Sequence, residues 1–274
     1  GGVGALSNTS DTVLGILQAV EDVSREFESE TGRSFAATLK TIHIQRHQRA
    51  CPDHLWLPED VASISSLTVD NDGDGTYELT LVEDTDYWAE REVDGDSNTP
   101  IVRLVLNPDA ATVQLSSWPT RYRAVRLTGF CGYSNEREST LTTTAEAVDD
   151  TETAIDVVNG SLVDPGDTIS FDSDDEQCEV LSVSGNTITV TRGINGTTAA
   201  AHANGATVYR RRYPRRVENA VKERAVGLRW DTQMGHAAAI SMGGETDAGG
   251  VSAIRASYAR WRRTVASYRR WEVA

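Results

Sequence analysis

Apolar residues recur at helical spacing near both ends of the chain, whereas apolar and polar residues alternate in the long segment between them. A helix is predicted from Ser10 to Gly32, because cap-forming residues precede it and its apolar side chains share one stripe of a 3.6-residue period. The stripe consists of Val13, Ile16, Leu17, Val20, Val23 and Phe27. A second helix is predicted from Pro214, a residue suited to a first helical turn, to about Met234.

The last predicted helix begins at Val251 or Ser252, after a Gly- and Ala-rich loop from Gly235 to Gly250. Its apolar positions follow a heptad seam: Val251, Ile254, Tyr258, Trp261, Val265 and Tyr268. Each of three arginines follows a seam residue: Arg255, Arg262 and Arg269. Two interpretations stay open, an ordinary bundle helix with a solvated basic face, or a protein interface. In the second, the aromatic residues Tyr258, Trp261, Tyr268 and Trp271 are anchors bordered by arginine.

Between the helical ends the alternation predicts short antiparallel strands. A first β region extends from Lys40 to about Tyr133, with one of its strands at Val113–Leu115. A polar, Thr-rich linker is predicted from Glu136 to Asp150, and a second β module from Thr153 to Tyr209. The predicted fold class is α+β, in which the N-terminal helix and two C-terminal helices form a small bundle. The predicted domains are 1–39 with 210–274 as the helical core, 40–135 as the antiparallel β region, and 136–209 as the inserted module.

Charge is distributed unevenly. The chain carries 26 basic and 41 acidic residues, a net charge of −15, and only two of the basic residues are lysines, Lys40 and Lys222. Dense carboxylates with little lysine are typical of proteins adapted to a salt-saturated cytoplasm, where hydrated surface carboxylates maintain solubility. A GC-rich genome combined with ordinary acidity is the alternative explanation. The segment from Tyr209 to Ala274 is basic, with 14 basic and 6 acidic residues. Such asymmetry predicts an interaction with nucleic acid, an acidic partner or the acidic part of another copy.

The three cysteines, Cys51, Cys131 and Cys178, are odd in number and far apart, so we expect buried thiols, no disulfide framework and an intracellular folding site. We expect no signal peptide in the first residues, which lack a basic segment followed by a long apolar one. No apolar run approaches the roughly 20 residues that span a bilayer, so no membrane partner is expected.

Candidate chemistry is sparse. Asp70, Asp72 and Asp74 repeat as in the first half of a calcium loop, but position 81 is Leu81 rather than the closing glutamate, which favours a solvated acidic turn. The five histidines do not cluster with cysteines at zinc-site spacing. No nucleophile–base, phosphate-loop or metalloprotease motif is present, so we expect no metal, no cofactor and no catalytic residues.

Several short motifs occur in a suggestive order. They are "SETGRSF" (29–35), "LWLPEDVASISSLTVD" (55–70), "YWAE" (87–90), "AVRLTGFCGY" (124–133) and "YPRRVENAVKERAVGLRW" (213–230). This order resembles the head-tail adaptor, or head-completion connector, family of long-tailed viruses. The acid-rich composition suggests a haloarchaeal host. The segment "TRGINGTTAAAHANGATVYR" (191–210) looks like a β module of tailed-virus neck and tail proteins, inserted where the family runs directly into the Pro-led helix.

The resemblance implies a virion structural protein at the head-tail junction, assembled in the host cytoplasm. Such adaptors form a ring, usually a dodecamer, beneath the portal protein. The ring extends the DNA channel, through which viral DNA passes without sequence readout, and seats a stopper or tail-completion protein. The implied portal interface is the last helix, with Tyr258, Trp261, Tyr268, Trp271, Arg255, Arg262 and Arg269. The alternative is a carbohydrate- or surface-binding protein of a tail or baseplate that uses the inserted β module.

Overall fold

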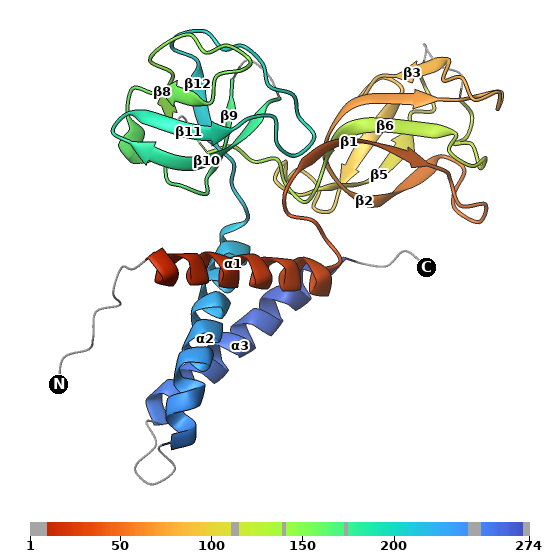
Figure 1. The fold of residues 1–274 in the computed structure, drawn as a ribbon. Helices are drawn as coiled ribbons and strands as arrows, with labels where there is room; N and C mark the ends of the chain where they lie inside the picture. The colour runs from red at the N-terminus through yellow and green to blue at the C-terminus, as the bar shows by residue number, and fades with distance from the viewer. Residues whose placement is uncertain (1–9, 111–114, 139–140, 173–174, 241–247, 271–274) are drawn as a thin grey trace. The chain divides into compact units, whose positions relative to one another are not determined.

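A computed structural model of the chain describes residues 10–110, 115–138, 141–172, 175–240 and 248–270, without the side chains of 10–14, 17, 229–240 and 248–255 (Figure 1). The chain divides into two compact units, one formed by 1–33 and 213–274 and the other by Ser34–Arg212. The fold is α+β: the described residues form three α-helices in the first unit and antiparallel sheets in the second. None of the helices is long and apolar enough to cross a membrane.

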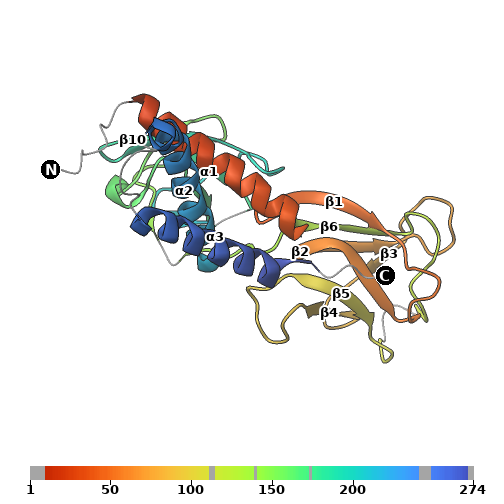
Figure 2. The same cartoon turned by 90° about the horizontal axis from the view of Figure 1, so that it is seen from below.

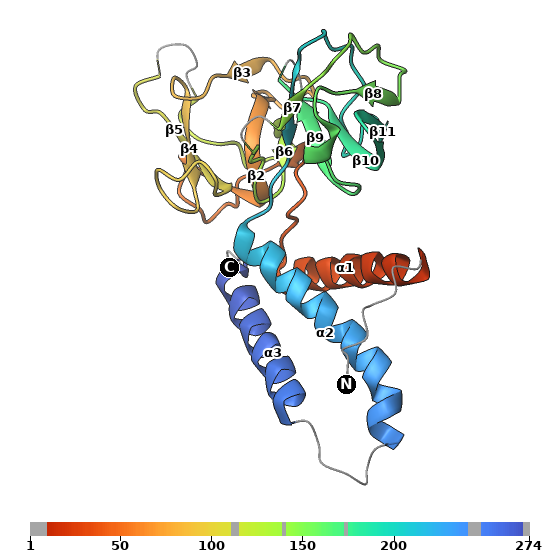
Figure 3. The same cartoon turned by 90° about the vertical axis from the view of Figure 1, so that its left-hand side faces the viewer.

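The helical unit contains α1 (Ser10–Thr31), α2 (Arg215–Ile240) and α3 (Ala248–Tyr268), with α2 and α3 forming a hairpin against which α1 packs (Figure 3). Helix α1 ends where predicted, because Gly32 adopts a left-handed φ of 67° and its N–H bonds the Glu28 carbonyl. Helix α2 begins at Arg215, directly after Pro214, and the Pro214 carbonyl accepts from the Val217 and Glu218 amides.

Two predicted boundaries in this unit are wrong. Helix α2 continues to Ile240 and α3 begins at Ala248, so both helices extend into the predicted loop Gly235–Gly250. The segment 237–239 is Ala-Ala-Ala, the best helix former, and this run offsets the cost of about 1 kcal/mol for Gly235 inside a helix. The part of the predicted loop at 241–247 lies outside the described residues.

The first sheet has the strand order β1-β6-β2-β5-β4, with β3 paired to β2 (Figure 2). Its strands are β1 (Thr38–Ile44), β2 (His54–Val69), β3 (Leu79–Leu81), β4 (Tyr87–Arg91), β5 (Ile101–Leu106) and β6 (Val125–Cys131). Strand β2 is long because register shifts let its first half pair with β5 and its second half with β6. Leu55, Leu67, Leu104, Trp118 and Leu127 are fully buried in the core. The strand predicted at Val113–Leu115 falls mostly outside the described residues.

The second sheet closes on itself. It consists of β7 (Thr142–Thr143), β8 (Ala154–Asp156), β9 (Thr168–Phe171), β10 (Gln177–Ser184), β11 (Thr187–Thr191) and β12 (Thr207–Arg210). The strand order is β7-β12-β9-β10-β11-β8, and a bridge between Thr144 and Val157 joins the two ends. The Ala145 and Val158 amides bond across the same seam at 2.7 and 2.9 Å. The result is a small barrel around an apolar core that includes Ile155, Ile169 and Phe171.

The predicted linker Glu136–Asp150 is part of this barrel, so that prediction is wrong. It contains β7, and Val148 is buried in the barrel core. Thr144 is also buried, where its hydroxyl donates to the Ala203 carbonyl at 2.8 Å. The threonines made this segment resemble a polar linker in the sequence. A β-branched residue can nevertheless occupy a barrel interior when its hydroxyl has a hydrogen-bond partner there. The helical unit is slightly smaller than predicted. Its first segment ends at 33 rather than 39, because β1 begins at Thr38, and its second segment begins at 213 rather than 210, because β12 ends at Arg210.

Candidate functional site

The C-terminal part of the aromatic seam of α3, from Trp261 to Tyr268, faces the interior of the helical unit. The Trp261 side chain is 1% exposed, and its ring meets Phe27 of α1 edge-on, with centroids 5.1 Å apart. Val265 is buried, and Tyr268 lies 6.4 Å from Phe27. The prediction of Trp261 as an exposed anchor is therefore wrong. A heptad seam requires a partner surface, and here α1 of the same chain provides it.

A second row of α3 residues remains accessible. Tyr258 is 43% exposed, and the guanidinium groups of Arg224 and Arg262 lie 5.1 and 6.0 Å from its ring centroid. We name Tyr258, Arg262, Arg263 and Arg269 the basic row. Its three arginines are exposed, and no carboxylate among the described residues forms an ion pair with them. Of the other predicted interface residues, Arg255 lies in α3 without a described side chain, and Trp271 lies outside the described residues.

The acidic turn at Asp70 contains a carboxylate that the sequence pattern missed. Glu78 joins Asp70, Asp72 and Asp74, with one oxygen of each within 4.8 Å of the others. Most of these oxygens have partners: Asp70 accepts from the Gly73 and Gly75 amides, and Glu78 accepts from the Asn71 amide. Arg121 lies 3.8 Å from the Asp70 carboxylate. These hydrogen bonds close the turn without a cation, and an acidic turn at Asp70, Asp72 and Asp74 stays the favoured prediction over a calcium site.

The strongest polar cluster lies inside the barrel, where Glu176 is fully buried. Its carboxylate accepts from Arg192 Nε at 2.6 Å and Arg192 Nη2 at 2.7 Å, a bidentate pair. His202 Nε2 donates to the same carboxylate at 2.8 Å and stacks on Phe171, with ring centroids 3.7 Å apart. The Ala200 amide adds a further bond at 3.0 Å. The loop after β11 is therefore folded around one buried charge.

The electrostatics of this cluster are those of a structural ion pair. Burial raises the pKa of Glu176, but hydrogen bonds from Arg192, His202 and Ala200 outweigh it and hold that pKa well below its usual value of 4.5. Cys178 Sγ lies 3.3 Å from the carboxylate. Burial, and then the charge of Glu176, raises the pKa of the Cys178 thiol well above its ordinary range. A fully buried neutral thiol is a poor nucleophile, so proximity to His202 and Glu176 does not make it a reactive cysteine.

This cluster accounts for the segment "TRGINGTTAAAHANGATVYR". Within this segment, Arg192 and His202 reach Glu176. Gly196 adopts a left-handed φ of 77°, and its backbone lies so close to the Leu39 carbonyl that a Cβ would not fit. The sequence indicated turn residues there, but the glutamate that organises the loop lies 16 residues before Arg192.

The first sheet carries a groove that the sequence did not indicate. Its volume is about 460 Å³, and it is lined by His43, Ile44, Gln45, Trp56, Pro58, Tyr122 and Arg123. Trp56 is 39% exposed and Tyr122 is 82% exposed. Arg123 has a left-handed φ of 58°, held by the Tyr77 hydroxyl, which donates to its carbonyl at 2.8 Å. Burial, and then Arg123 and Arg126, lower the pKa of His43, which favours a neutral ring in the groove.

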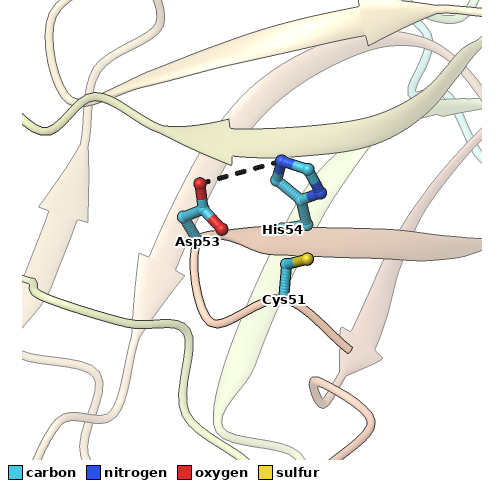
Figure 4. Close-up of side chains that lie close together, drawn as sticks. All are labelled: Cys51, Asp53 and His54. Carbon is cyan, nitrogen blue, oxygen red and sulfur yellow. Dashed lines mark ion pairs between the residues drawn. The ribbon is translucent and has the colours of Figure 1, made fainter. Parts of the chain in front are cut away.

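The turn before β2 overturns two further predictions. Cys51 is exposed rather than buried, and it lies beside Asp53 and His54 (Figure 4). One ligand atom from each of the three residues lies within 4.8 Å of the others. The prediction that no histidine clusters with a cysteine is therefore wrong. Three ligand residues within a single turn do not match the spacing of a four-ligand zinc site.

Comparison with known proteins identified no relative. No family model matches the chain, and neither a curated protein nor a solved structure matches it.

Proposed function

We propose that the chain is a structural adaptor of a tailed-virus neck, which forms a homo-oligomeric ring between the capsid portal and the tail. The ring extends the DNA channel and seats the next protein of the neck. The small bundle of α1, α2 and α3 is its core, and the barrel is an inserted module. The order of the sequence motifs suggests this role. The observation that supports it best is the difference in charge between the two units.

The two units differ strongly in charge. Ser34–Arg212 holds 13 basic and 29 acidic residues, a net charge of −16, whereas the helical unit holds 13 basic and 12 acidic residues, a net charge of +1. Within the helical unit the basic row has no acidic partner among the described residues. Such a surface is complementary to a carboxylate-rich partner, and charge complementarity directs association and fixes register.

We assign the basic row to protein rather than to DNA. A ring multiplies each arginine by its copy number, and a dense array of arginines facing DNA would bind phosphate strongly and slow the passage of the genome. A neighbouring copy or the portal protein is the better partner. With Trp261 in the core, Tyr258 is the aromatic residue of the row, and Arg262 is the arginine of the row that lies over its ring.

The test is light scattering on the purified protein in molar KCl, alone and with the portal protein of the same virus. A ring mass in either condition supports the proposal, and a monomer in both contradicts it. Arg262→Glu is expected to weaken assembly, because it places a carboxylate in the basic row. Arg25→Glu is the matched control, since Arg25 is an exposed arginine on α1 whose ion pair among the described residues is with its helix neighbour Glu21. Truncation before α3 is unsuitable, because it removes Trp261 from the core.

A second candidate function is binding of a carbohydrate by the groove at Trp56 and Tyr122. Exposed aromatic faces bordered by polar groups suit a sugar ring. The inserted module, expected to carry this activity, has only Phe171 and Tyr209 as aromatic residues, and Phe171 is buried. Titration with neutral oligosaccharides tests the idea: Trp56→Ala is expected to abolish binding, whereas Trp88→Ala, a substitution of an exposed tryptophan on β4, is expected to preserve it.

A further inference from the structure

A thiol, a carboxylate and an imidazole meet at one turn of the first sheet. Cys51, Asp53 and His54 each offer a ligand atom within 4.8 Å of the other two (Figure 4). His54 Nε2 lies 3.7 Å from Asp53 Oδ2. Bonds of about 2.0–2.3 Å to a tetrahedral ion separate the ligand atoms by roughly 3.3–3.8 Å. Side-chain rotations that close the group by roughly an ångström would therefore place all three atoms on one ion.

The backbone that carries these ligands is held firmly. The His54 amide bonds the Cys51 carbonyl at 3.1 Å, which closes the turn around Pro52. The fully buried Trp118 bonds the turn twice, from its amide to the Pro52 carbonyl and from Nε1 to the Asp53 carbonyl, both at 2.8 Å. The ligands thus have fixed origins, and only side-chain torsions remain to be ordered by a metal.

The ligand set selects the class of metal. We propose that Cys51, Asp53 and His54 form a binding site for a divalent transition metal, Zn²⁺, with a fourth position open to water or to a group from a partner. A thiolate and a carboxylate neutralise the ion, and an imidazole completes a set that favours zinc over calcium or magnesium. The site is accessible, because Cys51 is exposed and the Asp53 side chain is 53% exposed. It is independent of the proposed adaptor role.

Arg103 opposes metal binding at this turn. Its Nη1 lies 3.4 Å from His54 Nδ1, while its other nitrogens bind Glu90. When Nε2 binds a metal, Nδ1 carries the proton, so the contact from Arg103 must open. Arg103→Gln removes a positive charge near the ion and is expected to tighten zinc binding severalfold.

Site-specific alkylation tests the proposal on the full chain. Iodoacetamide, followed by mass mapping, is expected to modify Cys51 in metal-free protein but not the buried Cys131 and Cys178. Stoichiometric Zn²⁺ is expected to slow modification of Cys51 at least tenfold, and a chelator to restore it. His54→Ala and Asp53→Ala, which retain the thiol, are expected to lose most of the protection, and His43→Ala, on β1, is expected to keep it. Circular dichroism confirms that each variant is folded.

Co²⁺ provides a second readout that does not depend on alkylation. Wild-type protein is expected to develop a thiolate-to-cobalt charge-transfer absorption with tetrahedral ligand-field bands, and Cys51→Ser is expected to lose the former. The proposal is overturned if Zn²⁺ leaves the alkylation rate of Cys51 unchanged. It is equally overturned if His54→Ala and Asp53→Ala are protected as well as wild type, since zinc would then be held by the thiolate alone.

Discussion

Replacing Glu176 with glutamine removes the charge at the centre of the barrel while nearly preserving its shape. The carboxylate accepts hydrogen bonds from Arg192, His202 and the Ala200 amide, all of them donors. A glutamine amide turns one acceptor into a donor and leaves the buried Arg192 side chain, which is 6% exposed, without a counter-charge. Breaking one partner of a buried ion pair costs about 3–5 kcal/mol, and we expect Glu176→Gln to fall in that range.

The control is Glu179→Gln, on the same barrel strand. Glu179 is exposed, so its substitution is expected to change stability by less than about 0.5 kcal/mol. The assay is urea denaturation followed by circular dichroism, together with hydrogen exchange of the β10 and β11 amides. Tryptophan fluorescence would be insensitive, because all six tryptophans lie outside 136–209.

Salt separates the buried pair from surface effects. Exposed charges lose most of their interaction in molar salt, where the Debye length is about 3 Å, whereas a buried pair is screened much less. The difference between Glu176→Gln and Glu179→Gln is therefore expected to persist in molar KCl. Equal denaturation midpoints for the two variants, or a difference that disappears as KCl rises, would refute the view that Glu176 organises the barrel.

Three further predictions concern acid, the helical core and a glycine. The pKa of Glu176 is lower in the fold than its ordinary value of 4.5. The stability that its ionised form gives the protein is therefore complete above that pH and declines as the pH falls below it. Glu176→Gln is expected to flatten this decline in urea titrations from pH 6 to pH 3. Trp261→Ala is expected to lower the free energy of unfolding, measured by urea denaturation, by about 3–5 kcal/mol because it opens a cavity beside Phe27. Tyr258→Ala is expected to lower it far less, and equal losses would contradict the assignment of Trp261 to the core. Gly196→Ala is expected to lower the melting temperature more than Gly205→Ala. Both glycines have positive φ, which costs alanine about 1–2 kcal/mol, but of the two only Gly196 would place its new Cβ against a backbone oxygen, that of Leu39. Equal shifts in melting temperature would contradict this packing.

Local patterns predicted the elements of this fold well. The helix α1 follows from its apolar stripe and Gly32, and the start of α2 follows from Pro214, because caps and periodicity act within a few residues. Closure of the barrel was not predictable from such patterns. It depends on the pairing of Thr144 with Val157 across a segment whose threonines resembled a polar linker.

The candidate sites depended on long-range information to different degrees. Trp261 was correctly placed on a seam, but periodicity does not specify whether a seam meets its own chain or another. Glu176 was missed because its partners, Arg192 and His202, lie 16 and 26 residues along the chain and meet it only in the closed barrel. The group at Cys51 could have been predicted from the sequence. A cysteine, an aspartate and a histidine occur there within four residues, and a turn brings such close neighbours together.

The buried pair differs from surface ion pairs in its response to salt. In concentrated salt, surface ion pairs contribute little because they are screened. An ion pair that is to stabilise the barrel under such conditions must lie where salt does not reach, as Glu176 and Arg192 do with side chains that are 0% and 6% exposed. The loop around them then holds its shape through interior hydrogen bonds, which concentrated salt screens little.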